Sequence, residues 1–250
     1  MASQKTLALT LRITDYRETS QIVTVFTRDF GRLSLMSKGA KRKRRGGPGA
    51  VDLLQLVELV FIEKHNARLH LLTESRLLAD FAGLRARLDR GYAAFFVVEL
   101  LMGLTEEHDP NPALFEAARR TLERLACTDR PNGVLHAFEV RLLHLAGLLP
   151  RLDACALCGG PAATSGDVLF AATAGGVVCA RCAGTVVERV TVSRGAIAVL
   201  NKLAVTPLNR VERLRIDGTI ARDVRKMLAR QWMHILGREP RMLRYLRQDA

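Results

Sequence analysis

The spacing of hydrophobic residues changes near residue 75, and this change constrains the fold more than any other feature of the chain. Upstream, short segments alternate apolar and polar residues, as half-buried strands do. Downstream, apolar residues recur at helical spacing. Strands that precede helices in this way are typical of the α+β class. We therefore predict a β domain at residues 1–78 and a helical domain at residues 79–250.

Five strands are predicted in the first domain, at residues 5–16, 21–27, 32–37, 53–63 and 69–73. In the first strand, the alternation predicts that one set of side chains faces inward, namely Leu7, Leu9, Leu11 and Ile13. Five strands of this size usually close into a small barrel, because closure removes exposed strand edges. Among such barrels, the OB-fold is the commonest that binds single-stranded nucleic acid, so we predict an N-terminal OB-fold.

Six helices are predicted after the barrel, at residues 76–90, 93–107, 113–126, 134–148, 193–204 and 219–236. The segment 93–104 is apolar nearly all round, which predicts the buried central helix of a bundle. In the last helix, the buried side is expected to hold Ile220, Val224, Leu228 and Ile235 or Leu236.

Four of the five cysteines form two Cys-x2-Cys pairs, Cys155 with Cys158 and Cys179 with Cys182. Two such pairs can hold one tetrahedral metal ion, and four thiolates leave no open position for a reacting water. The spacing therefore predicts a structural zinc knuckle, inserted at about residues 151–190 of the helical domain. Redox dithiols are the alternative, but they normally occur singly in a βαβ context.

A cationic stretch lies between the third and fourth predicted strands, within residues 29–49. After an Asp29-Phe30-Gly31 turn, it carries the residues that we predict to bind DNA: Arg32, Lys38, Lys41, Arg42, Lys43, Arg44 and Arg45. Crowded cations repel one another, so a polyanionic partner explains them best. The alternative is a solvated loop. Aromatic residues make up only 5% of the chain, so phosphate contacts should dominate and sequence preference should be slight.

An excess of positive over negative charge is confined to the two ends of the chain. Residues 1–50 hold eleven Lys or Arg against three Asp or Glu, and residues 151–250 hold sixteen against eight. The middle segment holds eleven against fourteen. The C-terminal cations either form a second DNA-binding surface or a solvated face; they are Arg222, Arg225, Lys226, Arg238, Arg241 and Arg244, together with Arg230 and Arg247.

The sequence lacks the patterns of an enzyme or a membrane protein. No Ser/His/Asp set, paired carboxylates, phosphate-binding loop or dinucleotide fingerprint can be assembled. The most apolar run, residues 93–104, contains Glu99 and is too short to cross a bilayer. The N-terminus leads into a strand pattern without an apolar signal region, so we expect a cytoplasmic protein.

These motifs together resemble the RecO family of bacterial recombination mediators. The matching pieces are the turn at residues 15–20, the strand and turn at residues 23–32, Lys38-Gly39-Ala40-Lys41, the cysteine quartet and the basic segment at residues 237–246. The resemblance extends over nearly the whole chain. Some members of the family have lost part of the cysteine set, whereas this sequence keeps all four.

The resemblance implies a function without covalent chemistry. Proteins similar to this one bind single- and double-stranded DNA, anneal complementary strands, and act on strands coated by single-strand-binding protein, whose acidic tail they bind. With RecR, and often RecF, they help to load RecA, and their place is the nucleoid. A zinc-ribbon or OB-type module that binds RNA or ribosomes remains the main alternative. A nuclease and a scaffold for acidic proteins are two further alternatives.

Overall fold

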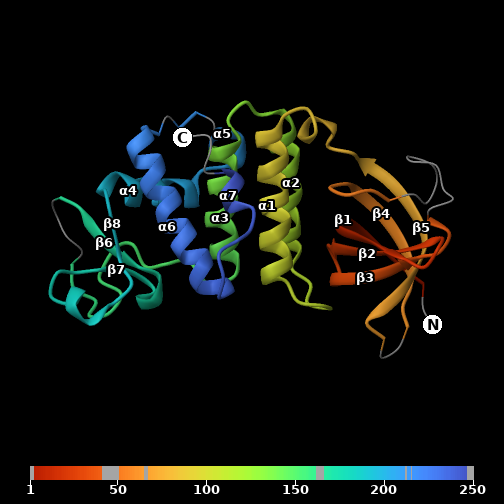
Figure 1. Cartoon of the computed structure of the whole chain (residues 1–250), viewed down its shortest axis with the longest axis horizontal. Helices are drawn as coiled ribbons and strands as arrows, with labels where there is room; N and C mark the ends of the chain where they lie inside the picture. The colour runs from red at the N-terminus through yellow and green to blue at the C-terminus, as the bar shows by residue number, and fades with distance from the viewer. Residues whose placement is uncertain are drawn as a thin grey trace. The chain divides into compact units, whose positions relative to one another are not determined.

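The computed structural model describes residues 3–40, 51–64, 67–161, 166–211, 213–214 and 216–246, and the chain separates into two compact units (Figure 1). Unit 1 is Met1–Cys127 and unit 2 is Thr128–Ala250. Two of the helices that follow residue 79 belong to unit 1, so this division does not coincide with the predicted boundary between residues 78 and 79. That boundary stays a prediction.

Unit 1 begins with a closed five-stranded barrel in the order β1-β2-β3-β5-β4. The strands are β1 (Ser3–Tyr16), β2 (Ser20–Thr27), β3 (Gly31–Ser37), β4 (Leu56–Ile62) and β5 (Leu69–Ala79). All neighbours are antiparallel except β3 and β5, which are parallel. This order confirms the predicted OB-type barrel.

The prediction that residues 76–90 form a helix is wrong in its first part. Strand β5 continues to Ala79 because it pairs with β4, placing Arg76 opposite Glu58, and their side chains form an ion pair of 3.1 Å. A single turn, η2 (Ala82–Leu84), follows, and helix α1 (Leu88–Leu104) begins later. Pairing with a distant strand thus decides the end of β5.

The predicted inward face of β1 is wrong for Leu9 and correct for Ile13. A register shift between Thr10 and Arg12 exchanges the two faces of the strand. The buried cluster inside the barrel contains Ala8, with Ile13 packed against it after the shift. Leu9 instead pairs with Phe26, whose ring lies 6.0 Å from that of Phe115. One set of β1 side chains is therefore buried in the barrel and the other is buried between the barrel and a helix.

Helices α1 and α2 (Pro112–Cys127) complete unit 1, and their connection is bonded to the barrel. The Arg32 amide donates to Glu106 O, and the His108 amide donates to Arg32 O, each at 3.3 Å. Gly31 has φ of +67°, and a β-carbon there would lie 2.4 Å from Asp109 O. Only glycine fits at this position.

Buried His70 and exposed His108 join the same connection to β5. The Nδ1 atom of His70 accepts a hydrogen bond of 3.2 Å from the Lys64 amide, so the neutral ring carries its proton on Nε2. That Nε2 lies 3.5 Å from Nε2 of His108. Burial, followed by the nearby His108, lowers the pKa of His70, and this outweighs the opposing effect of Glu63 and Glu107.

We expect the stability of unit 1 to fall as the pH is lowered. Below the ordinary histidine pKa of about 6.5, the unfolded chain binds a proton that native His70 does not, so unfolding is favoured. The contribution of neutral His70 to the free energy of unfolding is complete above that pH. It is lost as the pH falls through the lower pKa of the folded ring. Denaturation across this range, with an NMR titration of His70, measures the effect. The control is His70→Asn, whose amide oxygen can still accept from the Lys64 amide but does not titrate, so the pH dependence due to His70 should vanish. If His70 of the unmodified protein titrates at an ordinary or higher pH, the expectation is contradicted.

Unit 2 combines helices with a small sheet of order β7-β6-β8. Its helices are α3 (Pro131–Leu145), α4 (Arg194–Val205), α5 (Leu208–Val211), α6 (Gly218–Leu236) and α7 (Leu243–Leu246). The strands are β6 (Val168–Ala171), β7 (Gly176–Val178) and β8 (Val190–Val192), with single turns η3 (Ala172–Ala174) and η4 (Ala183–Thr185). The longer helices confirm the predicted ones, whereas the sheet was not predicted. Within the described residues, no helix is both long and apolar enough to span a membrane.

The core of unit 2 contains a polar network. The indole Nε1 of Trp232 donates to Glu139 Oε1 at 2.8 Å, and His136 Nδ1 lies 2.8 Å from Glu139 Oε2. All three side chains are buried. The network joins α6 to α3, and it shows that the buried side of α6 is centred nearer Leu228 and Trp232 than predicted.

Candidate metal centre and basic surfaces

Two tight turns present the four cysteines. In the first, the Gly159 amide donates to Cys155 O at 2.9 Å and the Cys155 amide donates to Gly160 O at 2.8 Å. Gly159 has φ of +70°, which glycine adopts without steric cost. In the second, the Cys182 amide donates to Cys179 O at 3.0 Å. Each turn brings the two thiols of one Cys-x2-Cys pair to the same side.

The structure brings all four sulfur atoms together, as the spacing predicted. Their Sγ atoms lie within 4.8 Å of one another, and those of Cys158 and Cys179 are 3.7 Å apart. Four thiolates at bonds of about 2.3 Å around a tetrahedral ion lie about 3.8 Å from one another. The donor set and its spacing therefore fit a metal ion.

The surroundings hold this cluster in place and favour the thiolate at one position. Cys155 is fully buried and packs with Ala171, Val178 and Val186. Amide donors, first that of Cys179, lower the pKa of the Cys155 thiol to about 6. Hydrogen bonds to the nearby thiols, first that of Cys158, raise the pKa of Cys182 to about 12, because they favour the protonated form of Cys182. A bound cation would instead favour the thiolate at this position.

The predicted DNA-binding residues divide into three groups. Lys38 is exposed directly after β3. Lys41, Arg42, Lys43, Arg44 and Arg45 lie outside the described residues. Arg32 is half-buried, and its Nη1 donates to Met102 O in the last turn of α1 at 2.8 Å. Its guanidinium thus has a structural partner in unit 1, and DNA binding by Arg32 stays a prediction.

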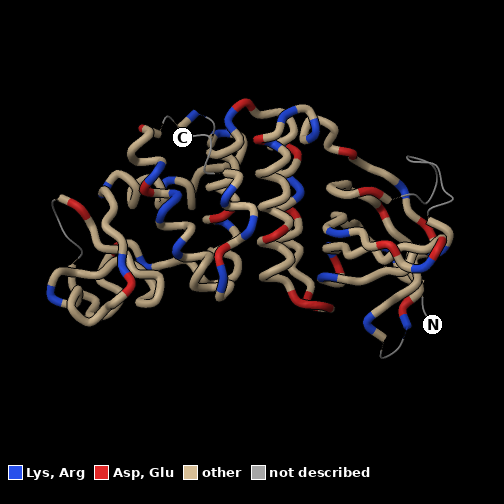
Figure 2. Tube along the Cα trace, in the orientation of Figure 1, with Lys and Arg blue, Asp and Glu red and all other residues tan. Residues whose placement is uncertain are grey.

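The C-terminal cations are spread over α6 and the residues that follow it (Figure 2). Arg225 is half-buried, and its guanidinium donates to Leu246 O. Arg244 lies after α6, with its guanidinium carbon 4.7 Å from the centre of the Tyr245 ring. Arg238 and Arg241 are exposed, and each has an interaction within the protein. By contrast, Arg222 and Lys226 lie one turn apart on an exposed face of α6.

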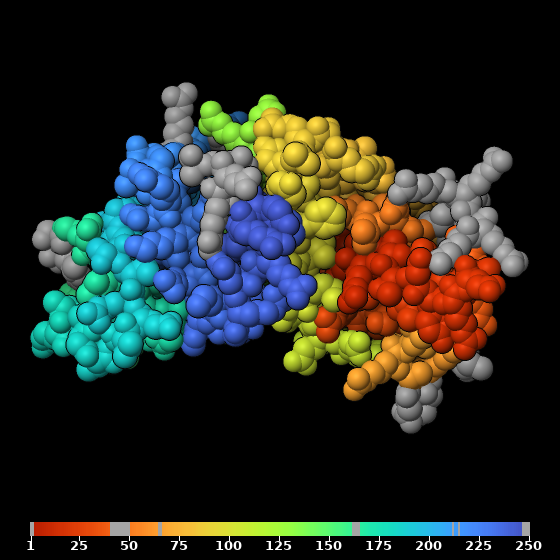
Figure 3. Space-filling view, in the orientation of Figure 1, coloured from red at the N-terminus to blue at the C-terminus, as the bar shows by residue number. Residues whose placement is uncertain are grey.

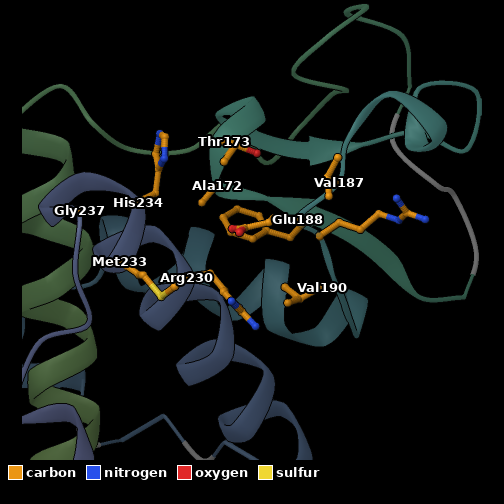
Figure 4. Close-up of a pocket in the computed structure, with 11 residues that line it drawn as sticks. Ala172, Thr173, Val187, Glu188, Val190, Arg230, Met233, His234 and Gly237 are labelled. Carbon is orange, nitrogen blue, oxygen red and sulfur yellow. The ribbon is translucent and has the colours of Figure 1, made fainter.

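Next to that face of α6 is a cavity of about 380 Å³ that sequence reasoning missed. Figure 4 shows Arg230, Met233 and His234 on α6 at one side of it and Val187 and Glu188 on the segment leading into β8 at the other. The only sequence signal for this feature was the four-residue spacing of basic residues along α6.

Comparisons with known proteins agree over nearly the whole chain. Residues 1–81 match the family model described as "Recombination protein O N terminal", and residues 85–243 match "Recombination protein O C terminal". A protein named "DNA repair protein RecO" from Rhodopirellula baltica is 32% identical, covering 96% of this chain and 97% of the relative. Its namesake from Anaeromyxobacter dehalogenans is 33% identical, covering 98% and 96%.

Proposed function

Since the chain belongs to the RecO family of DNA repair proteins, we propose that it is a recombination mediator that binds single- and double-stranded DNA and anneals complementary strands. Its partners would be RecR and the acidic tail of single-strand-binding protein, with RecF and RecA acting in the same process of loading RecA onto coated strands. It would work by binding, without covalent chemistry, in the cytoplasm at the nucleoid.

The observation that carries this proposal is the OB-type barrel with a cationic connection between β3 and β4. The connection starts at exposed Lys38, and its sequence continues with Lys41 to Arg45. The proposed DNA-binding domain is therefore the barrel itself, residues 1–78. OB-type barrels bind single strands across their strands and loops.

Charge neutralisation is the mechanism that we propose for annealing. Two strands repel one another through their phosphates, and a cationic surface screens that repulsion. Holding both strands on one protein also raises their effective concentration, so that pairing is faster.

Replacing Lys41, Arg42, Lys43, Arg44 and Arg45 with glutamine tests the proposal. Each phosphate contact on a single strand contributes about 0.7 to the slope of log affinity against log salt. We expect the slope to become shallower by up to about 3.5, with a similar loss for different sequences, measured by fluorescence anisotropy with labelled oligonucleotides.

A control that exchanges Arg42, Arg44 and Arg45 for lysine keeps the charge and should keep the slope. An unchanged slope in the glutamine variant would show that these five residues are not part of the proposed interface. The same titration with RNA separates the two nucleic-acid functions, because preference for RNA and absence of DNA annealing would favour the RNA-binding alternative.

The ion that we propose for the cysteine cluster is a single structural zinc. Cys155, Cys158, Cys179 and Cys182 would hold it, since thiolate sets of this spacing suit zinc. When bound, it supplies a crosslink between the two turns. The residues around it then fix the position of the segment that follows Cys182.

A further inference from the structure

A row of cations follows one side of α6. Arg222, Lys226 and Arg230 are spaced four residues apart, with His234 one further turn along, and all four are exposed. Four residues advance a helix by about 6 Å, so these side chains form a continuous row.

The row lies beside the segment 187–193 of unit 2. Lys226 Nζ donates to Thr191 O at 3.2 Å, and the Ser193 amide donates to Asp223 Oδ2 at 2.8 Å. These two bonds join β8 and the residue that follows it to α6. In the space-filling view, the surface of the knuckle region borders that of α6 (Figure 3). The cavity lined by Arg230, His234 and Val187 lies at one end of the row, and we call the row and this cavity together the α6 groove.

The groove has the two chemical features that a single nucleic-acid strand requires. Arg222, Lys226 and Arg230 outnumber the nearby acids, Glu188 and Asp223, of which Asp223 already accepts the Ser193 amide. Apolar surface lies beside this charge, since Val187 is 95% exposed and Met233 is 39% exposed. Phosphates can meet the cations while unpaired bases lie against the apolar side chains.

The metal-binding turns build one side of this groove. Val186 packs against Cys155 in the buried cluster of the knuckle. Arg189 then donates from Nη1 to the carbonyl oxygens of Ala183 and Val186, which fixes the course of residues 187–190. The position of Val187 and Glu188 thus depends on the fold of the cysteine cluster.

We propose that this α6 groove binds a single nucleic-acid strand, in addition to the strand held by the barrel. The proposal rests on the proposed annealing function and deepens it, because a second strand held on the same protein has a higher effective concentration for pairing. It also gives the cysteine knuckle a role in binding, as the support of one side of the groove.

The test uses a Lys226→Gln/Arg230→Gln variant of the full chain with its metal bound. Glutamine at position 226 can still donate to Thr191 O, so the contact between β8 and α6 is kept. The control is Lys202→Gln/Arg210→Gln, which removes the same charge from exposed positions of α4 and α5 that do not line the cavity. Circular dichroism and metal content establish that both variants are folded.

The measurement is energy transfer between donor-labelled and acceptor-labelled oligo(dT), which cannot pair with each other. We expect the unmodified protein and the control to hold both strands. The groove variant should keep its affinity for the first strand, bind the second about tenfold more weakly, and anneal complementary strands correspondingly more slowly.

If the groove variant and the control show equal energy transfer and equal annealing, the groove does not bind the second strand, and the proposed function stays intact. An unmodified protein that neither binds nor anneals DNA would instead overturn the proposed function. If the groove variant loses binding to a poly(Glu) peptide but retains the second strand, the groove is a protein-docking surface and the proposal fails.

Discussion

A Cys155→Ser variant is expected to lose the bound metal and to lower the stability of unit 2 sharply. The Cys155 thiol is fully buried, and its sulfur accepts the Cys179 amide at 3.4 Å, so it links the two turns of the cluster. Structural zinc contributes about 10–16 kcal/mol to the folding of small zinc peptides. Because unit 2 also has other buried contacts, we expect its free energy of unfolding to fall by less than this full amount, but by at least about 5 kcal/mol.

Metal analysis by mass spectrometry and thermal unfolding followed by circular dichroism measure this result. We expect one zinc per chain in the unmodified protein and none in the variant. The fifth cysteine provides the control, because Cys127 is exposed at the end of α2 and belongs to unit 1. Cys127→Ser should retain the metal and the unfolding temperature; a Cys155→Ser protein that does the same would show that the quartet does not bind the ion.

The cysteine cluster could be predicted from sequence because its geometry is local. Each Cys-x2-Cys pair needs only one tight turn, which Gly159 supplies in the first pair. The strands β6, β7 and β8 that support the cluster were missed, since three or four residues are too few to show a period. Spacing thus revealed the ligands but not the sheet behind them.

The barrel could be predicted as a set of strands, but their inward faces could not. Alternation alone gave Leu7, Leu9, Leu11 and Ile13 one common face, and the register shift near Thr10 divided them. The shift is set by pairing with β2, which no local pattern reports. The same limit applies to Gly31, which sequence reasoning placed in a turn and which also touches the backbone of Asp109.

The burial of polar residues is the hardest feature of this fold to predict from sequence. Glu139 lies in a helical segment among apolar neighbours, and nothing local distinguishes it from a solvent-facing glutamate. In the structure it is 3% exposed, and its two oxygens are occupied by Trp232 and His136. Trp232 was likewise left out of the predicted buried side of α6, although it is fully buried.

Glu139→Leu is expected to destabilise unit 2 by about 3–5 kcal/mol, because it leaves two buried polar groups without their partner. Trp232→Phe should cost less, about 1–3 kcal/mol, since it retains most of the aromatic ring and leaves only one carboxyl oxygen unpaired. Urea denaturation of each variant gives the free energy of unfolding.

The double variant determines whether the two residues act as a pair. If the hydrogen bond carries the effect, Trp232→Phe should add little to Glu139→Leu, because its partner is already gone. Additive losses would show that each residue stabilises unit 2 independently through packing.

Leu228→Ala on the same side of α6 provides the reference for packing alone, since it removes a buried apolar side chain. It should lower the free energy of unfolding by about 2–5 kcal/mol in both the Glu139→Leu and the Trp232→Phe variant. A coupling energy between Glu139 and Trp232 that exceeds the coupling of either residue to Leu228 would identify the network as the contact that fixes α6 against α3.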